Sequence, residues 1–127
     1  MSLRRAVVTG IGILAPNGSH KNIFWENIKS GVSGIGTIES FDTSGFQCKV
    51  AGQILDFDPL SHFNSKQIKR NARFTQFAIV AAKMALEDAG LEINDENAEN
   101  IGVLVGSGIG GLNVVEDQQT AFLKRGA

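Results

Sequence analysis

Residues 101–123 read IGVLVGSGIGGLNVVEDQQTAFL, and this stretch decides the fold class. Its first five residues form a short apolar run with several β-branched side chains, which is typical of a strand buried on both faces. A glycine-rich turn follows at residues 106–111, and from Leu112 to Leu123 the apolar residues recur at a rough helical spacing. A strand, a glycine turn and a helix in this order predict an α/β fold.

The turn at residues 106–111 contains four glycines and raises one large apolar side chain, Ile109. Glycine adopts positive φ without steric cost, so such a turn brings its backbone close to a neighbouring element. Loops that join strands to helices carry chemistry in α/β folds, which makes Ile109 a candidate functional residue.

Composition excludes several classes of protein. The chain has 127 residues, enough for one small domain, and its 12 Lys and Arg residues nearly balance 13 Asp and Glu residues. This balance gives no reason to expect nucleic acid or an anionic membrane as a partner. The single Cys48 excludes an internal disulfide and indicates a reducing compartment, so we expect a cytoplasmic protein.

The N-terminal residues resemble the basic and apolar regions of a signal peptide, but Gly10 and Gly12 interrupt the apolar run. No stretch approaches the roughly 18 apolar residues of a membrane span. We therefore predict neither secretion nor membrane insertion.

The remaining pattern predicts short elements joined by turns. Residues 6–8 predict a first buried strand, and residues 16–18 the turn that follows it. Residues 31–44 are predicted as an ordered loop and residues 46–55 as a strand at the edge of a sheet. A turn around Pro59 is expected next.

A short helix is predicted over residues 20–29. Ser19 is its expected N-cap, and Gly31 is its expected stop. Helical spacing places three apolar residues on its buried side: Phe24, Trp25 and Ile28.

A longer helix is predicted over residues 64–89. Asn64 followed by Gln67 forms a capping box at its start, and Gly90 suits a Schellman motif at its end. Residues 74–86 are apolar nearly all round, so we expect protein to cover most of this helix.

Four cations stand close together at the start of that predicted helix: Lys66, Lys69, Arg70 and Arg73. Positive charge near a helix N-terminus opposes the macrodipole. The cluster therefore indicates either a solvated helix start or a surface on which something anionic docks, such as an acidic protein or a phosphate.

Two glycine patterns follow predicted strands. Gly10-x-Gly12-x-x-Ala15 fits a relaxed dinucleotide-binding motif, and Gly106-x-Gly108-x-x-Gly111 fits the strict one. Pro16 falls where the first motif needs its helix, and neither motif is followed by a strand that ends in a ribose-binding acid. Close packing of strand on helix is the alternative role of both turns.

No catalytic set can be assembled from these residues. Cys48 has Lys49 beside it but no histidine nearby in sequence, so we expect an idle thiol. His20 and His62 are isolated, and no metal site is predicted. Five carboxylates near the end of the long helix are interpreted as surface residues: Glu87, Asp88, Glu92, Asp95 and Glu96.

Taken together, several segments resemble the N-terminal part of the β-ketoacyl-acyl carrier protein synthases, most closely the synthase II type. The resemblance covers essentially the whole chain. It rests on VVTGIGILAPNG at 7–18, WENIKSGVSGI at 25–35, FDTS at 41–44, KVAG at 49–52, RFTQFA at 73–78, ALEDAGLEI at 85–93 and IGVLVGSGIGG at 101–111.

The resemblance implies a partial thiolase-like fold, the N-terminal portion of a first half in which helices cover a mixed sheet. Residues 1–127 would form one incomplete domain. Family members are dimers that condense an acyl-cysteine with malonyl-carrier protein and release carbon dioxide. The family's cysteine and two histidines fall beyond the matching residues, so no catalytic residue is carried over and we expect the chain to be inactive alone.

Two sets of residues do carry over. Ile109 matches the family's acyl-pocket residue that helps to decide chain length. Lys66, Lys69 and Arg70 match the basic positions where the acidic carrier protein docks. Ala72 departs from the pattern, because relatives usually have an acidic residue there.

The resemblance thus predicts part of a fatty-acid condensing enzyme with acyl carrier protein and acyl chains as partners and with self-association as a dimer. It implies no cofactor. A non-enzymatic module that binds acyl chains or carrier protein is the alternative, and a dinucleotide-binding domain is a further one.

Overall fold

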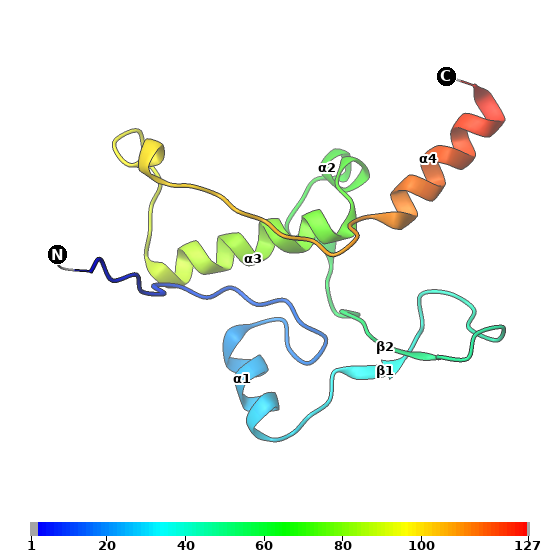
Figure 1. The fold of residues 1–127 in the computed structure, drawn as a ribbon, viewed down its shortest axis with the longest axis horizontal. Coiled ribbons are helices and arrows are strands. Elements are labelled where there is room, and N and C mark those ends of the chain that lie inside the picture. Colours follow the sequence, from blue (N-terminus) through cyan, green and yellow to red (C-terminus); the bar gives the residue numbers. More distant parts are fainter. Residues whose placement is uncertain (1–2, 127) are drawn as a thin grey trace. The chain divides into compact units, whose positions relative to one another are not determined.

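A computed structural model describes residues 3–126 of the chain (Figure 1). These residues divide into two compact units, one made of residues 3–58 and 80–92 and the other of residues 59–79 and 93–126. The elements in chain order are α1 (Lys21–Lys29), β1 (Ile35–Thr37), β2 (Val50–Gly52), the 3-10 helix η1 (Pro59–Ser61), α2 (Ser65–Arg70), α3 (Arg73–Ala89), the 3-10 helix η2 (Ala98–Asn100) and α4 (Leu112–Arg125).

In the first unit, the N-terminal extended segment packs on the C-terminal half of α3 (Figure 1). A Cβ atom added at Gly12 would lie 1.9 Å from the carbonyl oxygen of Ala81, and one added at Gly10 would lie 2.1 Å from that of Ala85. Both positions therefore require glycine, because any side chain would enter the helix backbone. This packing is the structural role that we considered for the first glycine motif.

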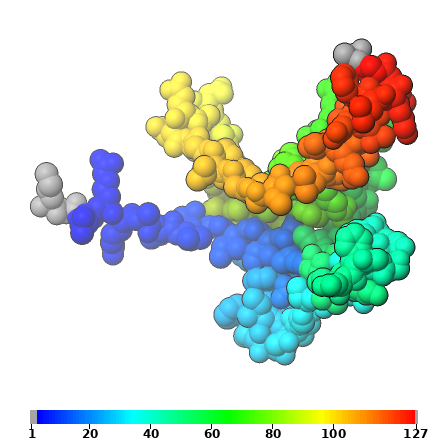
Figure 2. Space-filling view, turned by 45° about the vertical axis from the view of Figure 1, so that its right-hand side comes forward, coloured from blue at the N-terminus to red at the C-terminus, as the bar shows by residue number. Residues whose placement is uncertain are grey.

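The two strands predicted to be buried, at residues 6–8 and 101–105, are not formed. Residues 6–8 and 101–105 are extended but pair with no strand among the described residues, where β1 and β2 make the one two-stranded sheet. Val7 is 79% exposed and Leu104 is 99% exposed. Figure 2 shows the segment around residues 3–8, in dark blue, uncovered on this face. The physical reason is that a strand needs a neighbour for its backbone hydrogen bonds, and residues 3–126 supply none here.

The observed sheet is an antiparallel pair in which Gly36 lies opposite Ala51. β2 falls inside the strand predicted over residues 46–55, which is confirmed in part. β1 falls inside residues 31–44, so the prediction of a loop there was wrong. Helices with this small sheet agree with a partial α/β fold.

The FDTS segment between the two strands makes a local turn. The Asp42 carboxylate accepts hydrogen bonds of 2.9 Å from both the backbone N–H and the hydroxyl of Ser44. These bonds, the backbone one first, lower the pKa of Asp42, because they stabilise the ionised carboxylate.

Helix α1 begins one residue later than predicted. His20 is its N-cap, while the Ser19 hydroxyl instead donates to Asp56. The predicted stop is confirmed, because Gly31 has φ +69° and the N–H of Val32 donates to the carbonyl of Asn27 at 2.8 Å, as in a Schellman motif. Trp25 and Ile28 are exposed, so the prediction that they are buried was wrong.

The helix predicted over residues 64–89 is two helices, α2 and α3, separated at Asn71 and Ala72. Both predicted ends are confirmed. The Asn64–Gln67 capping box is present, and Gly90, with φ +61°, closes a Schellman motif in which Leu91 N–H donates to the Leu86 carbonyl.

The covering expected over residues 74–86 is incomplete. Val80 is buried at 2% exposure, whereas Phe74 belongs to the exposed apolar residues. None of the helices within residues 3–126 is long and apolar enough to cross a membrane.

The packing of Gly12 predicts a large cost for the smallest substitution. Gly12→Ala would place a methyl group 1.9 Å from the Ala81 carbonyl oxygen, so the segment must move off α3. We expect a loss of unfolding free energy of about 1–3 kcal/mol or more, measured by denaturant titration. Gly36→Ala is the matched control, because nothing lies within 4 Å of its added Cβ. Equal midpoints for the two variants would contradict the packing.

The exposed apolar residues predict self-association. Large contiguous apolar patches are rare on monomers, and unpaired extended segments offer backbone groups to a second chain. We expect a dimer or larger species in sedimentation and strong binding of a hydrophobic dye. A compact monomer with weak dye binding and a cooperative melt would contradict this prediction.

Candidate functional site

Helix α2 presents the predicted basic surface. The Asn64 side chain accepts from the backbone N–H groups of Lys66 and Gln67, which starts the helix at Ser65. Lys66, Lys69 and Arg70 are exposed and line one hollow of about 380 Å³. No acidic side chain in the described part of the chain forms an ion pair with these three cations.

The electrostatic argument made from the sequence was wrong for two of these cations. Because α2 ends at Arg70, Lys69 and Arg70 lie in its last turn rather than near the N-terminus of a long helix. Cations in that position are stabilised by the macrodipole. Their position in the last turn of α2 therefore gives no separate reason to expect an anionic partner. The prediction of a docking surface rests on the clustering of the three cations alone.

Arg73 is separated from the other three cations by the break after α2. Its guanidinium group lies over the Phe77 ring, 5.0 Å from the ring centroid, in cation–π geometry. A second hollow, of about 290 Å³, brings Lys69, Arg70 and Arg73 to one surface together with Asn113 and Val114 of α4.

Gln76 holds the break between α2 and α3. Its side chain is 5% exposed, and its Nε2 donates to the carbonyl of Asn71 at 2.8 Å and to that of Ile68 at 3.4 Å. These carbonyls belong to the end of α2, where a helix leaves backbone acceptors unpaired. Sequence reasoning missed Gln76, although it lies in the RFTQFA segment, because its partners depend on how the chain turns at Asn71.

The glycine turn at residues 106–111 leads directly into α4, as predicted. Gly110 has φ +84°, a conformation that favours glycine. The Ile109 side chain beside it is 78% exposed. Ile109 lines neither of the two hollows described above.

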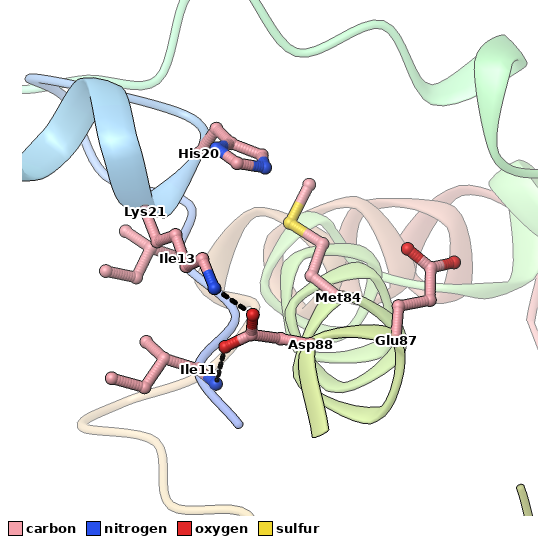
Figure 3. A pocket seen from close by; sticks show the side chains of 7 residues that line it. All are labelled: Ile11, Ile13, His20, Lys21, Met84, Glu87 and Asp88. Atoms are coloured by element: carbon pink, nitrogen blue, oxygen red, sulfur yellow. Dashed lines mark hydrogen bonds and ion pairs between the residues drawn. The ribbon is translucent and has the colours of Figure 1, made fainter. Parts of the chain in front are cut away.

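The first unit holds a pocket of about 300 Å³ beside α3 (Figure 3). The Asp88 carboxylate of α3 connects the segments that line the pocket. It accepts a hydrogen bond from Ile11 N–H at 3.0 Å and forms an ion pair with the Lys21 ammonium group. His20, Met84 and Glu87 complete the lining with Ile13. Asp88 is exposed, as expected for a surface residue, but sequence reasoning missed that it ties the N-terminal segment to α3.

The remaining sequence candidates lie apart from these surfaces. The Cys48 thiol is exposed and donates to the Val50 carbonyl at 3.5 Å. His20 caps α1, and the His62 ring lies 6.4 Å from that of Phe63. Within residues 3–126 no three His, Cys, Asp or Glu side chains meet in a group that could hold a metal ion.

The geometry also bears on the two glycine motifs. In a dinucleotide site the glycine backbone faces a pyrophosphate at the start of a helix. Here Gly10 and Gly12 face the backbone of α3, and the next helix begins at Lys21. At the second motif, Gly111 packs against Ala72.

The family model described as "Beta-ketoacyl synthase, N-terminal domain" matches residues 3–126. A 3-oxoacyl-[acyl-carrier-protein] synthase 2 of Synechocystis sp. is 46% identical over 123 residues, which are 97% of this chain and 30% of the relative. Its counterpart in Vibrio cholerae is 44% identical over 126 residues, covering 99% of this chain and 30% of that protein.

A solved structure gives the same result. The ishigamide ketosynthase/chain length factor matches with a TM-score of 0.74 and 28% identity, covering 94% of this chain and 30% of that one. The match confirms the partial thiolase-like α/β fold. The chain spans about 30% of the length of the curated relatives it matches.

The hydrogen bonds of Gln76 generate a stability prediction. Gln76→Leu leaves the carbonyls of Asn71 and Ile68 without their donor, and we expect a loss of about 1–3 kcal/mol of unfolding free energy. Gln76→Glu should cost more, because a carboxylate would face two carbonyl oxygens. Denaturant titration measures both variants.

The control is Gln118→Leu, which makes the same change at an exposed position of α4. If Gln76→Leu and Gln76→Glu unfold at the same midpoint as Gln118→Leu, Gln76 does not hold the α2–α3 break.

Proposed function

The chain belongs to the β-ketoacyl synthase family and matches its N-terminal domain, and from this premise we propose that it serves a fatty-acid condensing enzyme. The proposed reaction joins an acyl group held on a cysteine to malonyl-carrier protein, with loss of carbon dioxide. Residues 1–127 would be one segment of an incomplete domain. In this proposal the reacting cysteine and histidines belong to the part of the enzyme that follows the matched segment, so the chain alone does not condense.

The basic surface on α2 is the observation that carries the proposal. Lys66, Lys69 and Arg70 share one exposed hollow and have no acidic partner in the part of the chain that the structure describes. Unpaired cations on a helix attract an acidic protein over long range and orient it on approach. We propose that acyl carrier protein docks there.

Ile109 is the second element of the proposal. A large apolar side chain that is exposed on a glycine turn gains stability when another apolar group covers it. We propose that an acyl chain provides this cover, and that Ile109 helps to decide how long that chain can be.

A non-enzymatic role remains the second candidate, because the basic surface and Ile109 both lie on residues that the chain contains. Such a module would bind carrier protein or acyl chains without turning them over. Condensation assays separate the two roles, whereas binding assays do not.

Charge reversal tests the docking surface. Replacing Lys66, Lys69 and Arg70 by Glu should slow association with acyl carrier protein about tenfold or more and flatten its salt dependence. Stopped-flow titration at low and high salt measures both quantities. A triple reversal at Arg4, Lys29 and Lys49 changes net charge equally and serves as the control. If both triple variants associate equally fast, the hollow on α2 is a solvated surface.

Chain-length selection tests Ile109, in a chimera in which this chain replaces the corresponding first part of the Synechocystis relative. Ile109→Phe should cost long acyl substrates about 1–3 kcal/mol of strain, which is about tenfold or more in kcat/KM, and spare short ones. Ile109→Leu conserves volume and should keep the profile. An equal loss for long and short substrates would show that Ile109 does not gate chain length.

A further inference from the structure

The glycine turn that carries Ile109 rests on the start of α3. A Cβ added at Gly111 would lie 2.9 Å from the Cβ of Ala72 and 3.4 Å from Cε1 of Phe74. One added at Gly110 would lie 3.6 Å from two carbons of the same ring. These contacts join the C-terminal end of the turn to the residues that follow the α2–α3 break.

The other end of the turn has no such support. Nothing lies within 4 Å of a Cβ added at Gly106 or at Gly108. Ile109 therefore lies between Gly108, which has open space at its Cβ position, and Gly110, which lies against the Phe74 ring. The position of its side chain follows from how closely Gly110 and Gly111 approach Phe74 and Ala72.

We infer that Ala72 and Phe74 are positioning residues, which hold Ile109 where it selects acyl chains. This inference rests on the role proposed above for Ile109 and adds the residues through which that role is set. Ala72 also accepts the first helical hydrogen bond of α3, from Gln76 N–H at 3.1 Å, so its own position is fixed by the helix. Because the Ala72 methyl group is held in place and Gly111 has no side chain, the turn can pack closely against Ala72 in one position.

The position of the glycine turn against Ala72 and Phe74 is therefore sensitive to the addition of a single methyl group. Two Cβ atoms 2.9 Å apart are closer than carbon atoms pack, so Gly111→Ala must lift the turn or move Ala72. Removing the Ala72 methyl group opens the same space again. Ala72→Gly should therefore rescue Gly111→Ala, and glycine serves better than alanine at the N-cap of α3.

The first readout is the position of Ile109 in the full chain, independent of activity. Isoleucine δ1-methyl groups are labelled for NMR, and the Ile109 signal is identified by its absence from Ile109→Val. We expect Gly111→Ala to shift this signal, the double variant Gly111→Ala/Ala72→Gly to restore it, and the control Gly106→Ala to leave it in place. Phe74→Leu should shift it as well, through loss of the supporting ring.

The second readout is the acyl-length profile of the chimera. The ratio of kcat/KM for long over short acyl chains should change about tenfold in Gly111→Ala and return in the double variant. A profile that responds to Ile109→Phe but not to Gly111→Ala overturns the inference and leaves the proposed function standing.

Failure of the proposed function gives a different result from failure of this inference alone. If neither Ile109→Phe nor Gly111→Ala changes the profile, the proposed role of Ile109 in chain-length selection fails, and selection by Ala72 and Phe74 fails with it. An Ile109 methyl signal that moves equally in Gly111→Ala, in Gly106→Ala and in the double variant overturns the positioning itself.

Discussion

The contact of Gly10 and Gly12 with the backbone of α3 is the constraint on which the first unit depends. Only a residue without a side chain allows an extended segment to lie against the Ala81 and Ala85 carbonyls. Asp88 then fixes the segment from the same helix, by accepting from Ile11 N–H and pairing with Lys21. One face of α3 thus aligns both the segment and the start of α1.

The second unit depends on the N-terminal end of α3. The break at Asn71 and Ala72 separates α2 from α3, and the buried Gln76 amide closes it by donating to the exposed end of α2. The basic surface lies just before the break, and the residues that support the glycine turn lie just after it. A short stretch of chain therefore sets the places of both proposed functional surfaces, by local hydrogen bonds and close packing.

Local rules made the fold partly predictable from sequence. The capping box at Asn64 and the two Schellman glycines, Gly31 and Gly90, depend on neighbours within a few residues, and all three were predicted correctly. The strands at residues 6–8 and 101–105 were not, because strand formation depends on a partner that no local pattern specifies. The roles of Asp88 and Gln76 were missed for the same reason: Asp88 binds a residue 77 positions away, and Gln76 acts only because the helix breaks.

For the basic cluster, the predicted grouping was right but the physical argument for it was wrong. Lys66, Lys69 and Arg70 were placed together correctly, yet the macrodipole argument for them assumed one long helix and failed when α2 ended at Arg70. Arg73, which spacing grouped with them, lies beyond the break and stacks on Phe77. Arg73 nevertheless lines a hollow with Lys69 and Arg70, so the grouping by spacing holds for these three residues although the helix breaks between them.

We propose that this chain supplies the carrier-protein surface and the acyl-length residue of a condensing enzyme, but not its reacting groups. Condensation of acyl- with malonyl-carrier protein tests it most directly, measured for residues 1–127 alone and for the chimera with the Synechocystis relative. We expect turnover by the chimera and none by the chain alone. A folded but inactive chimera, or turnover by the chain alone that survives Cys48→Ala, would contradict it.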